Sequence, residues 1–254
     1  MQFGVDCAAS LSAPGGLKPH GVSFVCRYLS PPGNAKNITK AEAARIHAAG
    51  LDLVLVWEQN GDEPITGHAA TGAGASAGIL DARLAEAEAR AVGVPTAAPI
   101  FFALDRDPSG LSAAEWAAVD GYFKGVRQVL GKGRVGAYGG YALIKHLFDK
   151  RLIDYGWQTY AWSGGHWDAR AHLRQYLNAQ TLAGVSVDFD HALTVDYGQV
   201  RKPVEKPPIK YWRIVYRNRK GQFKEKHTRT PVRFQLLHPR VKRNGKLIQE
   251  PIRK

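Results

Sequence analysis

Acidic side chains recur where apolar stretches of this sequence end. They stand at or just beyond the ends of four predicted strands and comprise Asp6, Glu58, Asp105, Asp107, Asp188 and Asp190. Because functional groups of a parallel barrel gather at the carboxyl ends of its strands, we expect these side chains to meet at one mouth. Side chains alternate along a strand, so Asp105 and Asp107 are expected to share a face. Like charges held this close raise some of the pKa values.

Carboxyl groups with different pKa values are what glycoside hydrolysis requires. One group must donate a proton to the leaving oxygen while the other stays charged. Aromatic residues also end predicted strands, and such rings stack on the apolar faces of sugars. We therefore expect a carbohydrate-cleaving site. Its catalytic candidates are Asp6, Glu58, Asp105, Asp107 and Asp188, and its substrate-binding candidates are Trp57, Tyr138, Trp162, Gln175 and Asp190.

Two alternatives compete with this interpretation. Asp at a strand end often caps a helix or orders a turn, and Asp107, just before Pro108, is the clearest case. Clustered carboxylates also bind divalent ions. However, the sequence has no HExxH pattern, and His191 is the one histidine that we consider as a ligand. We expect neither a metal nor another cofactor.

Strand and helix patterns alternate through the first two hundred residues. Strands are predicted over 3–7, 21–29, 51–58, 98–107, 134–140, 156–162, 171–177 and 184–190, and helices over 39–50, 79–93, 112–131 and 141–150. Thr39 with Glu42, and Ser112 with Glu115, have the spacing of capping boxes. Residues 66–78, rich in Gly and Ala, are expected to form a flexible loop.

This alternation predicts an α/β fold with parallel strands. Eight strands favour a TIM-type (β/α)8 barrel, irregular in its last third, where helix patterns are weak. An open doubly wound sheet is the alternative, but no Gly-rich phosphate fingerprint follows the first strand.

Charge divides the chain into two parts. Residues 1–200 carry 17 Lys and Arg against 19 Asp and Glu, whereas residues 201–254 carry 18 against 3. We expect a barrel over 1–200, a Pro-rich linker over 201–208, and a basic β-rich module over 209–254 with a hairpin turn at Asn244-Gly245. Basic residues interleaved with aromatics suit a nucleic acid and an anionic cell-wall polymer equally, although no DNA- or RNA-binding motif appears. Docking into a larger assembly is a third possibility.

The N-terminal residues lack the pattern of a signal peptide, and no apolar stretch reaches the length that spans a bilayer, so no membrane partner is expected. Cys7 and Cys26 lack zinc-ligand spacing. Two buried free thiols are favoured over a disulfide.

Four segments together resemble the glycoside hydrolase-like domain of unknown function found in actinobacteria and their phages. In chain order they are "FGVDCAAS", "VCRYLSPPGNAKNITKAEAARIHAAGLDLVLVWEQNG", "PIFFALDRD" and "GVSVDFDHA". The resemblance covers about residues 2–198, and the domain is related to the family-25 lysozymes, which cut peptidoglycan.

The resemblance implies roles for particular residues. Asp6 matches the aspartate that ends the first strand of these lysozymes, and Val187–Asp190 match a late V-D-x-D/N motif. Asp105 and Asp107 stand where the lysozymes have D-x-E, whose glutamate is the acid. Here that position holds the shorter aspartate, so the acid role falls to Asp107 or Glu58.

We therefore expect a peptidoglycan-directed glycoside hydrolase, phage-encoded as an endolysin or tail-associated lysin. It would reach the cell wall from the virion or from the host cytoplasm. The resemblance also implies that residues 201–254 bind the wall or dock to phage tail proteins, so a nucleic acid is the less favoured partner. The alternative, from a different class, is a catalytically inactive carbohydrate-binding or structural component of a phage tail.

Overall fold

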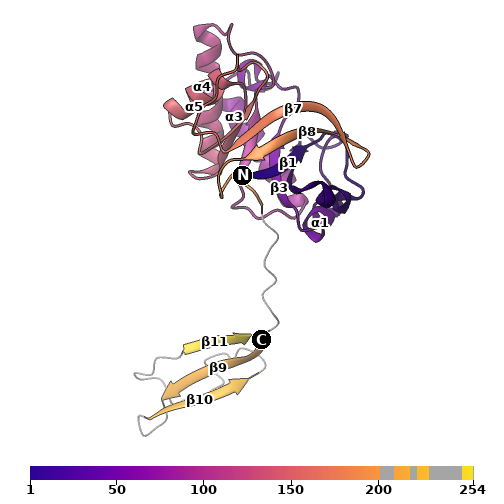
Figure 1. Ribbon diagram of the computed structural model, residues 1–254. Coiled ribbons are helices and arrows are strands. Elements are labelled where there is room, and N and C mark those ends of the chain that lie inside the picture. Colours follow the sequence, from indigo (N-terminus) through magenta and orange to yellow (C-terminus); the bar gives the residue numbers. More distant parts are fainter. Residues whose placement is uncertain (201–208, 218–221, 229–247, 254) are drawn as a thin grey trace. The chain divides into compact units, whose positions relative to one another are not determined.

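The computed structural model describes residues 1–200, 209–217, 222–228 and 248–253. The chain forms two compact units, Met1–Lys202 and Pro203–Lys254 (Figure 1). The second unit contains a three-stranded antiparallel sheet in the order β10-β9-β11, formed by Phe223–Thr228, Ile209–Arg217 and Ile248–Arg253. The expected linker over 201–208 and the turn at Asn244-Gly245 lie outside the described residues.

The first unit is an α/β fold built on a closed eight-stranded barrel. Its strands are β1 (Gln2–Asp6), β2 (Val22–Leu29), β3 (Asp52–Trp57), β4 (Ile100–Ala103), β5 (Val135–Gly139), β6 (Tyr155–Thr159), β7 (Leu173–Leu182) and β8 (Val185–Ala192). Strands β1 to β7 run parallel, but β8 is antiparallel to both of its neighbours, β7 and β1. The closed barrel is thus confirmed, whereas a fully parallel (β/α)8 arrangement is wrong.

A tight turn explains the reversal of β8. Ala183 and Gly184 alone separate β7 from β8, and both have positive φ, 50° and 77°. This is the conformation of a two-residue hairpin turn, which joins antiparallel strands. A parallel connection would need the crossover segment that the sequence lacks here.

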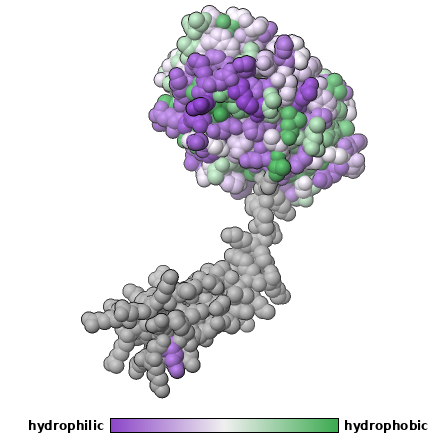
Figure 2. Space-filling model, turned by 60° about the vertical axis from the view of Figure 1, so that its left-hand side comes forward, coloured by the Kyte–Doolittle hydropathy of each residue, from purple (hydrophilic) through white to green (hydrophobic). Residues whose placement is uncertain are grey.

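Helices cover part of the barrel. They are the 3-10 helix η1 (Pro14–His20) and the α-helices α1 (Lys40–Ala48), α2 (Glu63–Thr66), α3 (Ala75–Ala91), α4 (Ala113–Leu130) and α5 (Tyr141–Asp149). Figure 1 shows β7 and β8 without a helix over them, and Figure 2 shows a face of this unit on which hydrophilic residues prevail. Within the described chain no helix combines the length and apolarity of a membrane span.

The Gly/Ala-rich segment 66–78 is not the loop that we expected along its whole length, because α3 begins at Ala75. Small residues there permit close packing of α3 on α4. A Cβ on Gly78 would lie 2.0 Å from the Tyr122 carbonyl oxygen, and one on Gly125 would lie 2.2 Å from that of Ala75. The composition therefore serves helix packing.

Alternation along the strands separates two hydrophobic layers. Val54 and Val56 belong to the cluster inside the barrel, whereas Leu53, Leu55 and Trp57 belong to the cluster between the barrel and its helices. Trp57 is therefore enclosed outside the barrel wall. Cys7 and Cys26 are both buried free thiols, as the sequence indicated.

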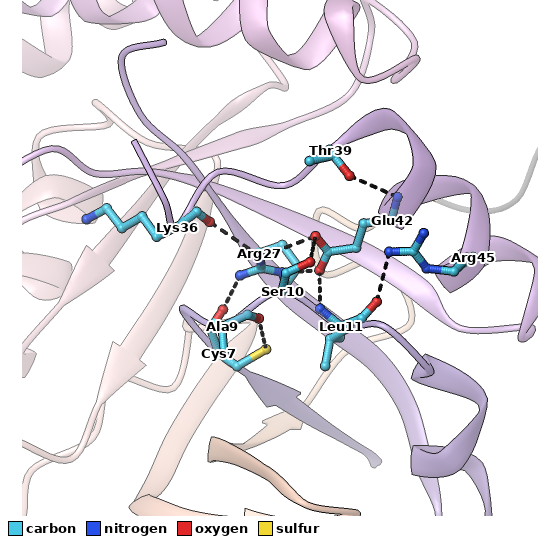
Figure 3. A network of polar contacts seen from close by, with 9 residues as sticks. All are labelled: Cys7, Ala9, Ser10, Leu11, Arg27, Lys36, Thr39, Glu42 and Arg45. Atoms are coloured by element: carbon cyan, nitrogen blue, oxygen red, sulfur yellow. Dashed lines mark hydrogen bonds and ion pairs between the residues drawn. The ribbon is translucent and has the colours of Figure 1, made fainter. Parts of the chain in front are cut away.

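A buried ion pair fastens α1 to the barrel (Figure 3). The Arg27 Nε lies 2.7 Å from Glu42 Oε1, and both side chains are fully buried. Burial raises the pKa of Glu42, but hydrogen bonds from Arg27 and from the Leu11 N–H outweigh it and lower the pKa. The Thr39 hydroxyl caps α1 by accepting from the Glu42 N–H, but the Glu42 carboxylate faces Arg27, so the capping box is only half formed. Ser112 and Glu115 form a complete one.

The same guanidinium holds two loops that lead to the barrel mouth. Arg27 Nη1 donates to the carbonyl of Cys7, the residue after Asp6, and Arg27 Nη2 donates to the Lys36 carbonyl at 3.4 Å (Figure 3). Ser10 also donates to Glu42, at 3.1 Å. The ion pair therefore fixes the backbone on both sides of strand β2.

We predict that Glu42→Ala lowers the free energy of unfolding by about 3–5 kcal/mol, because it leaves the Arg27 charge buried and unpaired. Urea denaturation measures the change. Asp149→Ala is the control, since the Lys145–Asp149 pair is about half exposed (50% and 46%) and should matter little. Equal effects of the two substitutions would contradict the role of the buried pair.

Candidate active site

Side chains from seven strands or the loops after them converge at the barrel mouth. They are Asp6, Tyr28, Glu58, Asp105, Tyr138, Gln175 and Asp188, whose hydrogen bonds and mutual electrostatic effects link them into one cluster. Asp6 is the last residue of β1 and lies opposite Asp188 in the β1–β8 pairing. The acids from distant parts of the sequence therefore meet as expected.

Gln175 connects the two central carboxyl groups. Its Nε2 donates to Asp6 Oδ2 at 2.9 Å and to Asp188 Oδ2 at 3.3 Å. The Tyr138 hydroxyl donates to Gln175 Oε1 at 2.9 Å, which fixes the orientation of the amide. The Tyr28 hydroxyl lies 3.5 Å from Asp6 Oδ1. The amide thus holds Asp6 and Asp188 at a set position relative to each other.

Asp6 and Asp190 form a buried carboxyl pair beneath the mouth. Asp190 is fully buried, and Trp157 Nε1 donates to its Oδ1 at 2.8 Å. Among the described residues no conventional donor reaches Asp190 Oδ2, whereas Asp6 lies within hydrogen-bonding reach of the Asp190 carboxyl. Two carboxyl groups hydrogen-bond only if one carries a proton, so this proximity favours the protonated form of one of them.

Burial and like charge shift the pKa values of this pair upward. Burial, followed by the charge of Asp188, raises the pKa of Asp6 to about 7. Burial, followed by the charge of Asp6, raises the pKa of Asp190 well above its usual range. Both shifts favour the neutral, protonated forms of these two carboxyl groups.

Asp188 is better solvated than this pair. It is half-buried, and the Ala179 N–H donates to its Oδ1 at 2.7 Å. Burial raises the pKa of Asp188, and the bond from Ala179 opposes the rise. Ala179 adopts a positive φ of 56° at the irregular part of the β7–β8 pairing. That local irregularity is what aims a backbone N–H at the carboxylate.

Asp105 and Glu58 lie at the rim. Lys36 Nζ forms an ion pair with Glu58 Oε1 at 2.6 Å and lies 5.2 Å from the centre of the Tyr28 ring. Asp105 is exposed, yet desolvation by its surroundings, followed by the charge of Glu58, raises its pKa, and Lys36 opposes the rise. The rim therefore combines one cation with two carboxyl groups.

The loop after β3 positions Asp105. The Asp105 N–H donates to the Gly61 carbonyl at 2.7 Å, and Gly61 has a φ of 90°. The buried Glu63 carboxylate accepts from the N–H groups of Asn60 at 2.6 Å and Gly61 at 3.2 Å. A side chain on Gly61 would place its Cβ 3.0 Å from that of Asp105. Glycine is thus required there for both conformation and space.

Two expected site residues lie elsewhere. Strand β4 ends at Ala103, so strand alternation does not extend to Asp105 and Asp107, and the expectation that they share a face is wrong. Asp107 is exposed, and its carboxylate accepts a hydrogen bond from the Ser109 N–H at 2.9 Å. This bond lowers the pKa of Asp107. Asp107 therefore orders a local turn, which was the alternative interpretation of its position in the sequence. Trp57 is enclosed between the barrel and its helices, away from the mouth.

The other binding candidates differ in exposure. Gln175 and Asp190 are buried and support the mouth from below, and Tyr138 is buried beside them. Trp162 is exposed and follows the end of β6. Asp188 lies within β8, not at its carboxyl end, and reaches the mouth because β8 runs antiparallel.

Sequence reasoning missed Tyr28 in the cluster and Lys36 at its rim. Tyr28 follows Cys26 by two positions on β2, so alternation alone would have placed it inside the barrel. Lys36 belongs to the loop before α1, and the sequence contains no periodic signal for it. Among the described residues no three His, Cys, Asp or Glu side chains are arranged to hold a metal ion. The cluster is suited instead to proton transfer and to stabilising positive charge.

Residues 16–194 match the family of Rv2525c-like, glycoside hydrolase-like domains. The Mycobacterium tuberculosis protein Rv2525c, whose name presents it as a candidate peptidoglycan hydrolase, is 29% identical over 207 residues, which span 77% of this chain and 82% of that protein.

Solved structures share the fold of the first unit. The crystal structure of Tat-secreted Mycobacterium tuberculosis Rv2525c in complex with L-tartrate matches with a TM-score of 0.66 at 27% identity, over 78% of this chain and 98% of that one. The muramidase of Trichobolus zukalii matches with a TM-score of 0.52 at 14% identity, over 76% of this chain and 94% of that one. The barrel is thus structurally related to muramidases.

We predict that stability falls as pH rises toward neutrality. The pKa of Asp6 is about 7 in the folded chain and 3.8 as its ordinary value, so the folded state binds the extra proton between these values. The stabilisation that this extra proton provides is complete below pH 3.8 and is lost as the pH rises through about 7. Urea unfolding at about pH 5 and about pH 8 measures this loss.

Two substitutions assign the effect to Asp6. Asp6→Asn cannot titrate and should flatten the decline in unfolding free energy over this range. Asp107→Asn is the matched control, because the pKa of Asp107 is lowered and its carboxylate is already charged throughout. A decline of unchanged steepness in Asp6→Asn would contradict the assignment.

Proposed function

Because this chain belongs to the Rv2525c-like family of glycoside hydrolase-like domains, we propose that it hydrolyses glycosidic bonds in the glycan of peptidoglycan. The observation that carries the proposal is the convergence of Asp6, Asp105 and Asp188 at one mouth, each with a raised pKa. The name of the Mycobacterium tuberculosis relative supports peptidoglycan as the substrate.

We assign the proton donor to Asp105. Its side chain is exposed at the rim, where a leaving oxygen can reach it, and the raised pKa favours the protonated form that an acid needs. Asp107 is turned to its own loop, and Glu58 is ion-paired with Lys36, so neither is placed as well for this role.

Asp188 supplies the negative charge. Bonds from the Ala179 N–H and the Gln175 amide stabilise its carboxylate and fix its position. A charged carboxylate at that place stabilises the positive charge that develops on the sugar ring during bond cleavage. Asp6 lies beneath and orients Asp188 through Gln175.

A carbohydrate-binding component without catalysis is the second candidate. The observation that favours it is the position of Asp107, which stands in place of the lysozyme glutamate and faces away from the cluster. Binding to peptidoglycan without bond cleavage would identify this function.

For the second unit we propose attachment to an anionic cell-wall polymer. Residues 201–254 carry 18 Lys and Arg against 3 Asp and Glu, so long-range attraction would hold the chain near a negatively charged surface. The barrel, nearly neutral over residues 1–200, would then act on the glycan of the same wall.

We predict that Asp105→Asn and Asp188→Asn each lower the release of reducing ends from purified peptidoglycan by about 10²–10⁴-fold. Asp107→Asn should retain close to wild-type activity. On an aryl glycoside whose phenolate departs without protonation, Asp105→Asn should recover most of its rate, because the acid is no longer needed, whereas Asp188→Asn should not. A wild-type chain that binds peptidoglycan but releases no reducing ends would support the second candidate.

We also predict that sodium chloride weakens binding of the full chain to purified walls, because salt screens the attraction between exposed charges. Sedimentation with walls at about 50 mM and about 200 mM salt measures the bound fraction. Replacing Lys224 and Lys226 by Gln should lower the binding at low salt. Binding that is equally strong at both salt concentrations would contradict an electrostatic role.

A further inference from the structure

We propose that Trp162 forms a stacking platform for a sugar ring beside the carboxylate mouth. This inference rests on the proposed function and adds a binding position to it. Trp162 lies three residues beyond the end of β6, in the loop that follows this strand. Its ligand is a pyranose of the glycan, which presents an apolar ring face to an indole.

The loop that carries Trp162 is joined to the carboxylate cluster. The Tyr160 N–H donates to the Gln175 carbonyl at 3.0 Å, and the Gln175 side chain links Asp6 to Asp188. Gly140 lies two residues beyond Tyr138, and a Cβ on Gly140 would meet the Trp162 Cβ at 3.3 Å. Trp162 therefore stands over the ends of β5 and β6, at the edge of the mouth.

The backbone of Trp162 is held in an unfavourable conformation. Its φ is 54°, in the left-handed region that costs energy for a bulky residue and that glycine adopts readily. Residues kept in such conformations cluster at binding sites, where the surrounding structure holds them. A glycine would serve this turn better, so the indole must contribute something else.

Buried polar contacts enforce the conformation. Ser163 Oγ donates to the Thr159 carbonyl at 2.6 Å and accepts from the Tyr141 N–H at 2.9 Å. The fully buried Gln158 donates to the His166 carbonyl at 2.9 Å and accepts from the Asp168 N–H at 3.0 Å. The loop is thus fixed on both sides of Trp162, so the backbone that carries the indole is positioned before a ligand arrives.

Trp162 is only partly covered by the rest of the chain, unlike the tryptophans of the core. Trp162 is 38% exposed, and the neighbouring Tyr160 is 47% exposed, whereas Trp57 and Trp157 are each 1% exposed. A large apolar ring contributes to stability mainly through burial. Strain together with exposure at the edge of the mouth therefore points to a contact with ligand.

The test compares Trp162→Gly with Trp162→Phe in an Asp105→Asn background, so that hydrolysis cannot deplete the ligand. The probe is a soluble oligomer of N-acetylglucosamine, and calorimetry measures its affinity. Trp162→Gly should weaken binding about tenfold, whereas Trp162→Phe should retain most of the affinity because a ring remains. Leu193→Ala is the control, since Leu193 is also exposed but follows β8 at the opposite end of the barrel.

Stability separates the platform from a structural role. Trp162→Gly loses the covered part of the indole but relieves the strain at this φ, so the urea midpoint should change little while binding weakens. A lower midpoint with unchanged affinity would overturn the platform. If the Asp105→Asn chain binds the oligomer and Trp162→Gly binds it equally, the platform fails while the hydrolase proposal stands. If Trp162 matters for binding but the wild-type chain cleaves no glycan, the platform stands and the hydrolase proposal fails.

Discussion

The antiparallel pairing of β8 with β1 is the constraint on which the site depends. It places Asp188 opposite Asp6 and Asp190 opposite Gly4, although these residues lie at the two ends of the barrel sequence. Because β8 runs antiparallel to the other strands, the residues near its start face the mouth. Asp188 therefore lies at the mouth, and Asp190 lies deeper in the barrel. The hairpin turn at Ala183-Gly184 is what makes this direction possible.

Bringing acids together inside a barrel has an electrostatic cost that the structure limits in two ways. Burial raises the pKa of Asp190 well above its usual range and favours its neutral form, which limits the repulsion at the mouth. Gln175 and the Ala179 N–H supply donors to the carboxyl groups of Asp6 and Asp188. The result is a graded set of acids, from a fully buried one at the floor to solvated ones at the rim. Such grading allows one group to donate a proton while another stays charged.

Sequence patterns predicted the barrel and the meeting of its acids, because strand periodicity and helix caps are local signals. The Ser112–Glu115 capping box is one that the structure confirms. Direction was not predictable for β8, since Ala183-Gly184 is not one of the dipeptides that strongly indicate a hairpin turn. Trp57 was misplaced because an unbroken apolar strand does not reveal which face is inside. Asp107 was misplaced because β4 ends four residues earlier, and strand boundaries depend on tertiary contacts. Lys36 reaches the mouth from a loop, where no periodicity applies.

The buried Arg27–Glu42 pair stabilises the loops that shape the mouth, although the pair itself lies outside the mouth. An apolar pair of similar volume could fill the same space, and replacing buried ion pairs in this way is often neutral or stabilising. It could not, however, donate to the carbonyls of Cys7 and Lys36. Cys7 directly follows Asp6, and the Lys36 side chain forms the ion pair with Glu58. A guanidinium offers five donors in a fixed plane, so it can bind a carboxylate and two separate loops at once. The charge therefore secures loop geometry, and the site inherits its rigidity from a contact on the outer side of the barrel wall.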